Sequence, residues 1–272
     1  KLADSLEHGK RLVELDPTDL SSLKILATIY LARKDFVGAA ETYSKLIEGF
    51  EREGSDQGYL FVLQNLQQNE LTVKERITLF KELAKRNPKD PKPAVLTAGM
   101  LLDAGEYEAG KRWLDNAITL DETDPKIYAL YSFYYWHKGE PQSSITLLKT
   151  AYAKYGAATI GYELVKSLVA DFQYEEAYRA AKEIVKKPDN SMAIYEYLAL
   201  MEFALGDYEG AGRTLQRLQN EPDLFLQTAL RLFYLSEELG REAELIPLLP
   251  SAEKQSPEYV SEYFAHQAKI AL

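Results

Sequence analysis

Residues 193–222 read AIYEYLALMEFALGDYEGAGRTLQRLQNEP, and this stretch decides the fold. Its apolar residues recur at helical spacing on both sides of the turn at Gly206, for example Tyr195 and Leu198 before it and Ala211 and Leu215 after it. Glycine supplies the backbone conformation that ends a helix, and the proline that closes the stretch can end one helix and start the next. The stretch therefore predicts two helices joined by a short turn.

The same turn returns along the chain at a nearly fixed interval. The turn glycines, separated by gaps of 34, 67 and 34 residues, are Gly105, Gly139, Gly206 and Gly240. Phe172 stands at the skipped position and Lys34 near the start, each in the same turn without its glycine. Prolines mark the other junction, at Pro17, Pro88, Pro188 and Pro222. A period of this length predicts stacked helix pairs rather than one compact core.

With this period and these turns, the sequence resembles the tetratricopeptide repeat family over essentially its whole length. The family consensus has a large residue, Leu and a small residue, an aromatic, Gly-Asp-Tyr, a small residue and a closing Pro. The resemblance implies an all-α fold, a right-handed superhelical α-solenoid of about seven 34-residue helix-turn-helix repeats with half-repeats at both ends. We expect a single domain made of a leading half-repeat at 1–15, repeats near 20–53, 57–90, 91–124, 125–157, 158–191, 192–225 and 226–253, and a terminal helix at 256–272.

Two repeats depart from the small residues that let paired helices approach. The small pairs are Ala27/Ala39, Ala98/Gly110, Ser132/Ser144 and Ala199/Ala211, and the departures are Gln64/Arg76 and Phe233/Leu245. Overpacking such a contact costs about 1–3 kcal/mol unless the backbone moves, so we expect these two helix pairs to splay apart. Pro247 and Pro250 should also shorten or kink the second helix of the last repeat. The departures fit either plain degeneracy of the repeat or a hinge.

Composition argues against catalysis and against nucleic-acid binding. The chain of 272 residues carries a net charge of −10, which repels phosphate backbones. It has no cysteine, and its three histidines, His8, His137 and His266, are far apart in the sequence, so we expect no metal site, no cofactor and no enzyme activity. No apolar run approaches the roughly 18–20 residues of a transmembrane helix.

The resemblance also implies where a ligand binds. Family members hold ligands on the concave face, along particular positions of each first helix. Those positions predict a peptide-binding groove formed by Phe61, Asn65, Gln68, Phe133, Trp136, Tyr162, Lys166, Phe203 and Tyr234, together with Lys24, Thr28, Val95, His137, Glu196 and Leu200. Aromatics on an open surface usually mark a binding site, although some of these side chains could instead make ordinary contacts between repeats.

A scaffold or adaptor that binds a protein or peptide segment in this aromatic-rich groove is the leading functional hypothesis. The family's clamp for acidic chaperone tails is broken, because Thr28, Val62 and Leu96 stand where Asn, Asn and Arg are needed, although Lys24 and Lys92 are present. We therefore expect no affinity for such tails. Open solenoid ends would also permit a homo-oligomer.

Two other functions stay open from the sequence. One is a regulatory or targeting domain of a larger enzyme or of a secretion or assembly protein. The other is an RNA-binding helical repeat, which the acidic charge disfavours. The general pattern is similar to bacterial cell-envelope tetratricopeptide proteins that recruit proteases or assembly machinery, which favours the periplasm or cell envelope over the cytoplasm. The chain starts mid-repeat at Lys1, so we expect the natural protein to continue beyond one or both ends.

Overall fold

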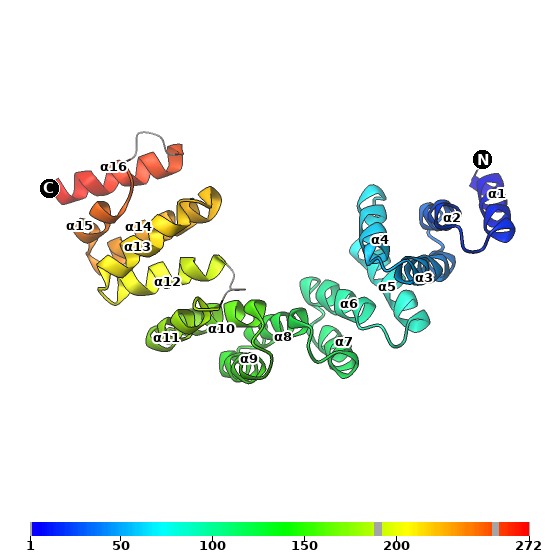
Figure 1. The fold of residues 1–272 in the computed structure, drawn as a ribbon, viewed down its shortest axis with the longest axis horizontal. Coiled ribbons are helices and arrows are strands. Elements are labelled where there is room, and N and C mark those ends of the chain that lie inside the picture. Colours follow the sequence, from blue (N-terminus) through cyan, green and yellow to red (C-terminus); the bar gives the residue numbers. More distant parts are fainter. Residues whose placement is uncertain (1, 188–191, 252–255, 272) are drawn as a thin grey trace. The chain divides into compact units, whose positions relative to one another are not determined.

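The computed structural model describes residues 2–187, 192–251 and 256–271, and all regular structure in these residues is helical (Figure 1). The helices are α1 (Leu2–Leu15), α2 (Leu20–Ala32), α3 (Phe36–Arg52), α4 (Gln57–Gln68), α5 (Val73–Arg86), α6 (Lys92–Asp103), α7 (Tyr107–Leu120), α8 (Pro125–His137), α9 (Pro141–Tyr155), α10 (Ala158–Ala170), α11 (Tyr174–Ile184), α12 (Ala193–Ala204), α13 (Tyr208–Leu218), α14 (Pro222–Leu239), α15 (Glu242–Leu245), a 3-10 helix (Ile246–Leu248) and α16 (Pro257–Ala271). The predicted junction at Pro188, the predicted repeat ends at 191 and 253, and the terminal residues Lys1 and Leu272 lie outside the described residues.

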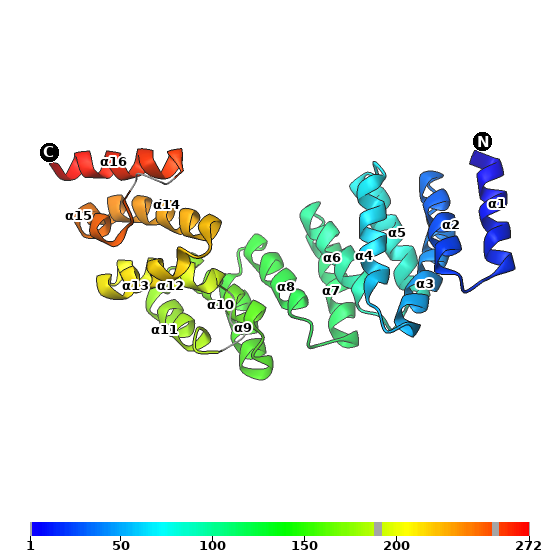
Figure 2. The same ribbon diagram turned by 45° about the horizontal axis from the view of Figure 1, so that its top comes forward.

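The helices pack in sequential pairs, which confirms the predicted all-α fold of helix-turn-helix units (Figure 2). Close pairs include α2 with α3, α6 with α7, α10 with α11 and α12 with α13. Residues 1–134 form one compact unit and residues 135–272 another, with the boundary inside α8. We describe the two units separately.

Small residues bring paired helices close, as the sequence predicts. Ala27 of α2 and Ala39 of α3 have no exposed surface, and the same holds for Ala98 of α6. A Cβ added at Gly110 of α7 would lie 2.7 Å from Leu102 Cγ and 3.2 Å from the carbonyl oxygen of Ala98. A larger side chain would have to push α7 away from α6, so the small residue sets the spacing of this pair.

Except between α4 and α5, the turns between paired helices share one backbone conformation, with or without glycine. Lys34 and Phe172 have φ angles of 59° and 61°, in the left-handed region that Gly206 occupies with φ of 83°. In two of these turns an aspartate then caps the following helix. Asp35 accepts a hydrogen bond from the backbone N–H of Gly38, and Asp207 accepts one from that of Gly210. The turns at Lys34 and Phe172 are therefore the same structural element as the glycine turns.

The structure shows how the two aberrant repeats accommodate their large residues. Helix α5 packs on α3 and α6, and its contact with α4 is marginal within the part of the chain that the structure describes. The predicted splay at Gln64/Arg76 is therefore confirmed. In the last repeat, Phe233 and Leu245 are both fully buried and α14 contacts α15, so the splay predicted for this pair is wrong. Helix α15 is a single turn that passes into a 3-10 helix containing Pro247. The predicted effect of the prolines is confirmed, and the second helix of this pair is shortened.

Phe172→Gly should stabilise the protein, and Gly206→Ala should destabilise it. The left-handed conformation costs a residue with a Cβ about 1–2 kcal/mol relative to glycine, and the Phe172 side chain is 77% exposed, so little packing is lost. A Cβ at Gly206 would meet no atom within 4 Å, so its effect reports the backbone conformation alone. Thermal unfolding followed by circular dichroism measures both changes. Equal shifts of the same sign would contradict the shared turn conformation.

Candidate functional site

The nine predicted peptide-binding residues divide between the two units. Phe61, Asn65 and Gln68 lie on α4 and Phe133 on α8, all in the first unit. The second unit holds the other five, which are Trp136, Tyr162, Lys166, Phe203 and Tyr234. Helix α8 carries Phe133 of the first group and Trp136 of the second, because the boundary between the units falls inside it.

In the first unit, α2 and α4 border an open groove that we call the α2–α4 groove. Its cavity has a volume of about 310 Å³ and is lined by Lys24, Ile25, Thr28, Ile29 and Phe61. Three of these residues, Lys24, Thr28 and Phe61, occupy positions that the sequence predicts for a ligand. Ile25 and Ile29 were missed, although their spacing of four residues on one helix face is a visible signal.

Aromatic packing fixes Phe61 in this groove. The Lys24 ammonium lies 4.9 Å from the ring centre of Phe50 and 5.6 Å from that of Phe61. On its other side Phe61 meets Tyr43 edge to face, with ring centres 6.4 Å apart. A cation over an aromatic ring is attracted by the ring's quadrupole, so Lys24 holds the ring while its charge remains partly accessible. The groove therefore offers a fixed apolar wall with one cation beside it.

Asn65 joins α4 to α2 rather than facing a ligand. Its side chain is buried, and its Nδ2 donates a 2.8 Å hydrogen bond to Thr28 Oγ1. Its Oδ1 accepts a 3.0 Å hydrogen bond from Asn69 Nδ2. An amide engaged at both ends cannot grip a peptide without losing these bonds. Gln68, one turn further along α4, is exposed, so its amide is accessible to solvent.

In the second unit, three of the predicted residues have partners within the protein. Trp136 donates from its indole Nε1 to Ser167 Oγ at 3.3 Å, and Tyr162 meets Tyr197 edge to face at 5.7 Å between ring centres. Lys166 is exposed and pairs with Glu163 at 3.2 Å. An exposed ion pair of this kind is weak, so Lys166 can still turn to a ligand.

Helix α12 of the second unit is too deeply buried to form a groove. Residues 194–203 are all buried, because α10, α11, α13 and α14 all pack on the helix. Phe203 has no exposed surface and packs on Tyr208 with ring centres 5.4 Å apart. The prediction that Phe203 contacts a ligand is therefore corrected, since it belongs to the core. Tyr234 on α14 is 63% exposed.

The other predicted groove positions on α12 are buried as well. Leu200 is buried, and the buried carboxylate of Glu196 pairs with Arg231 of α14. Burial raises the pKa of Glu196, and the charge of Arg231 offsets part of that rise. Burial also raises the pKa of Glu202, whose carboxylate accepts a 2.7 Å hydrogen bond from Thr214 Oγ1. These carboxylates are held inside the unit and are not presented to a ligand.

Of the remaining predicted positions, Val95 on α6 is also buried, Phe133 on α8 is half-buried, and His137 at the end of α8 is exposed. Half-burial leaves part of the Phe133 ring accessible. Some of the predicted binding residues are therefore accessible, and others belong to the core. Three of the accessible positions lie together in the α2–α4 groove.

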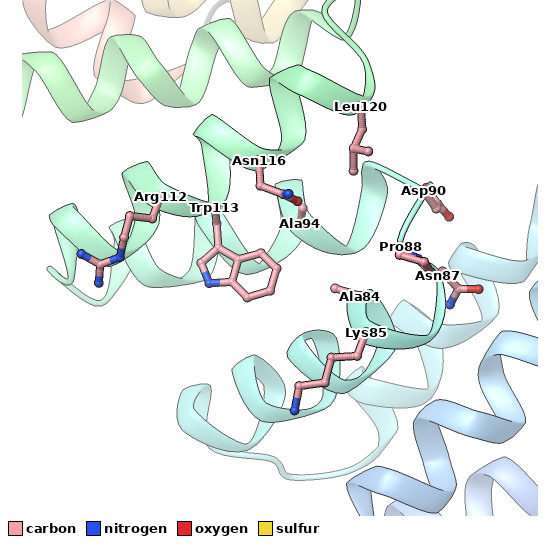
Figure 3. A pocket seen from close by; sticks show the side chains of 10 residues that line it. All are labelled: Ala84, Lys85, Asn87, Pro88, Asp90, Ala94, Arg112, Trp113, Asn116 and Leu120. Carbon is pink, nitrogen blue, oxygen red and sulfur yellow. The ribbon is translucent and has the colours of Figure 1, made fainter.

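A second cavity lies between α5, α6 and α7, and we call it the Trp113 pocket (Figure 3). Its volume is about 330 Å³, and its apolar surface comes from Ala84, Ala94, Trp113 and Leu120. The predicted binding positions all lie on first helices, whereas Trp113 lies on α7, a second helix. The sequence feature that could have indicated this pocket is the tryptophan directly after Arg112.

The described residues contain no group of three or more His, Cys, Asp or Glu side chains that could hold a metal ion. His266 is buried, with Nδ1 2.9 Å from the carbonyl oxygen of Glu262 and Nε2 3.1 Å from that of Phe233. Nε2 therefore links α16 to α14, whereas Nδ1 contacts the backbone of its own helix. None of the helices within the described ranges is both long and apolar enough to cross a membrane.

Comparison with known proteins agrees with this architecture. Residues 162–224 match the family described as tetratricopeptide repeat. The TPR repeat-containing protein YpiA of Bacillus subtilis is 27% identical over 166 residues, which are 60% of this chain and 39% of the relative. The chain thus spans about two fifths of the length of this curated relative.

Two solved structures share the fold at low sequence identity. Yeast Tom70 superposes with a TM-score of 0.59 at 14% identity, over 99% of this chain and 59% of that one. Pseudomonas aeruginosa PilF superposes with a TM-score of 0.51 at 14% identity, over 87% of this chain and 99% of that one. At this identity the likeness concerns the fold alone.

Asn65→Ala should lower the free energy of unfolding by about 1–3 kcal/mol, because the partners of a buried amide are left unsatisfied. Gln68→Ala is the matched control on the same helix, and it should change the free energy of unfolding by less than about 0.5 kcal/mol because the side chain is exposed. Urea denaturation followed by circular dichroism compares the two. Similar effects of both substitutions would show that Asn65 does not brace the groove.

Glu202→Gln should stabilise the protein at neutral pH but not in acid. The folded-state pKa of Glu202 is raised above the ordinary value of 4.5, so the fold favours the protonated carboxyl. Below pH 4.5 the group is protonated whether folded or unfolded, and the penalty appears as the pH rises through the folded pKa. Glutamine keeps an acceptor for Thr214 without the charge.

Thermal unfolding between pH 4 and pH 8 tests this effect of Glu202. The exposed Glu209→Gln on α13 serves as the control for loss of one negative charge. The proposed burial penalty would be contradicted if the gain in thermal stability from Glu202→Gln did not grow with pH. It would also be contradicted if Glu209→Gln gave the same gain.

Proposed function

We propose that this chain, with its tetratricopeptide-type repeats, is an interaction scaffold whose α2–α4 groove holds an extended, largely apolar segment of a partner protein. The observation that carries the proposal is the exposed Ile25 side chain, 49% accessible, beside the half-buried ring of Phe61 in one cavity. Apolar side chains that remain accessible around a cavity gain free energy when a partner removes them from water.

The groove is rigid before a partner arrives. Asn65 ties α4 to α2 through Thr28, and Lys24 and Tyr43 hold the ring of Phe61 from two sides. A surface that is already ordered loses little conformational entropy on binding, so more of the contact free energy appears as affinity. Gln68 and Lys24 add polar groups near the apolar wall, and such groups can orient the backbone of an extended segment.

The second unit offers a smaller set of accessible groups to such a segment. Trp136, Tyr162, Lys166 and Tyr234 remain candidates for contacts with the same or another partner. Phe133, in the first unit, is a further candidate. The cellular location stays a prediction from the sequence, which favours the cell envelope. A regulatory or targeting role within a larger protein is the alternative, and the short span of YpiA that the chain matches is compatible with it.

Ile25→Glu should weaken binding of selected peptides by about ten-fold or more, because a charge placed in an apolar contact must be desolvated. A peptide display library panned on the unaltered chain supplies the peptides, and fluorescence polarisation gives the affinities. Val37→Glu is the matched control, since Val37 is 54% exposed on α3 and lies outside the cavity.

Circular dichroism should show that both variants keep the helical content of the unaltered chain. The proposal predicts apolar consensus peptides whose affinity falls only in Ile25→Glu. Peptides that bind both variants as tightly as the unaltered chain would place the partner surface elsewhere.

A further inference from the structure

The Trp113 pocket has the size and the lining to hold one side chain of a partner. Helices α5 and α7 both pack on α6, and the gap between them is floored by the small side chains of Ala84 and Ala94. The indole of Trp113 extends from α7 into this gap and forms one wall (Figure 3), and Leu120 adds apolar surface. A volume of about 330 Å³ accommodates one large apolar side chain and part of its backbone.

Two cations from facing helices border the Trp113 pocket. In Figure 3, Arg112 of α7 and Lys85 of α5 lie around the indole, while Asp90 lies at the other end. Arg112 is exposed and makes no ion pair with any residue that the structure describes. Lys85 pairs with Glu82 on its own helix, but its side chain is 68% exposed, and solvent weakens such a pair. Both cations are therefore available to an anionic partner.

On the α5 side of the pocket the chain is locally basic, although the whole chain is acidic. Residues 73–92 contain seven Lys and Arg but only three Asp and Glu, whereas the chain as a whole carries a net charge of −10. This basic stretch supplies α5 and the turn that enters α6. A local excess of positive charge beside an apolar cavity is complementary to an acidic segment that carries an apolar residue.

We propose that the Trp113 pocket is a second docking site, which binds an acidic protein segment carrying one large apolar side chain. The apolar side chain enters the gap against Trp113, Ala84 and Ala94. The flanking carboxylates of the segment pair with Arg112 and Lys85, and the planar guanidinium of Arg112 suits two-point contact with a carboxylate.

A nucleic acid fits this site less well than an acidic peptide. Phosphate binding draws on positive charge along a strand, and the net charge of −10 opposes an extended polyanion. The pocket presents one indole and small aliphatic side chains, which suit a single inserted side chain rather than a row of stacked bases. The site shares no lining residue with the α2–α4 groove, so the two can be tested independently.

Intrinsic fluorescence provides a reporter inside the pocket. The chain has two tryptophans, so Trp136→Phe leaves Trp113 as the single source of tryptophan fluorescence. The probe is a short capped peptide with one leucine centred in a run of glutamates and a fluorescein label for polarisation. We expect a saturable change in Trp113 emission, with weaker binding as salt rises, because the contact is partly ionic.

Arg112→Glu should weaken the peptide by about ten-fold or more, since it replaces attraction with repulsion at the pocket. Arg179→Glu, an exposed position on α11, makes the same charge change away from the pocket and should leave affinity within about two-fold. Ile25→Glu should leave it unchanged, which separates this site from the proposed groove. If Arg112→Glu loses helical content, Lys85→Glu tests the same contact at another exposed side chain.

Several results would overturn the proposal. One is an unchanged Trp113 emission and polarisation at millimolar peptide. Another is an equal loss of affinity in Arg112→Glu and Arg179→Glu. A third is equal binding of a peptide in which lysine replaces glutamate. Equal or tighter binding of a single-stranded oligonucleotide in the same assay would assign the pocket to nucleic acid instead.

Discussion

The close contact between small residues of paired helices is the constraint on which the rest of the structure depends. Where Ala27 faces Ala39, or Ala98 faces Gly110, the two helices approach until little more than backbone separates them. Such a contact fixes spacing within the pair, and stacking of pairs then follows from the remaining apolar faces. At Gln64/Arg76 the contact is lost, and α5 packs on α3 and α6 instead of α4. Helix α4 packs on α3 and reaches α2 through the hydrogen bond between Asn65 and Thr28, with Phe61 half-buried beside it in the candidate groove.

The two units use charge and burial differently. In the first unit the cations Lys24 and Arg112 stand beside accessible aromatic surface. In the second, α12 is enclosed by α10, α11, α13 and α14, and its carboxylates at Glu196 and Glu202 are buried with raised pKa values. Buried carboxylates contribute to the internal contacts of that unit at a desolvation cost, whereas exposed cations remain available to a partner. The first unit is therefore the better place to look for recognition.

The sequence predicted the parts of this structure that depend on local conformation. The interval between turns, the equivalence of Lys34 and Phe172 with the turn glycines, and the shortening at Pro247 all follow from backbone preferences of a few residues. The site depends on neighbouring helices, which a consensus does not describe. Asn65 is buried because Thr28 of the preceding repeat lies within hydrogen-bonding distance, and Phe203 is buried because the neighbouring helices pack on α12. Trp113 was missed because only first helices were expected to line a site.

In the proposed complex, the accessible face of α2 and α4 receives the partner. Backbone amide hydrogen exchange, measured with and without a peptide selected for binding to the chain, tests it directly, since a ligand suppresses local opening of the segments that it contacts. The account predicts that exchange slows in residues 20–32 and 57–68. Slowed exchange confined to other helices, with α2 and α4 unchanged at saturating peptide, would contradict it.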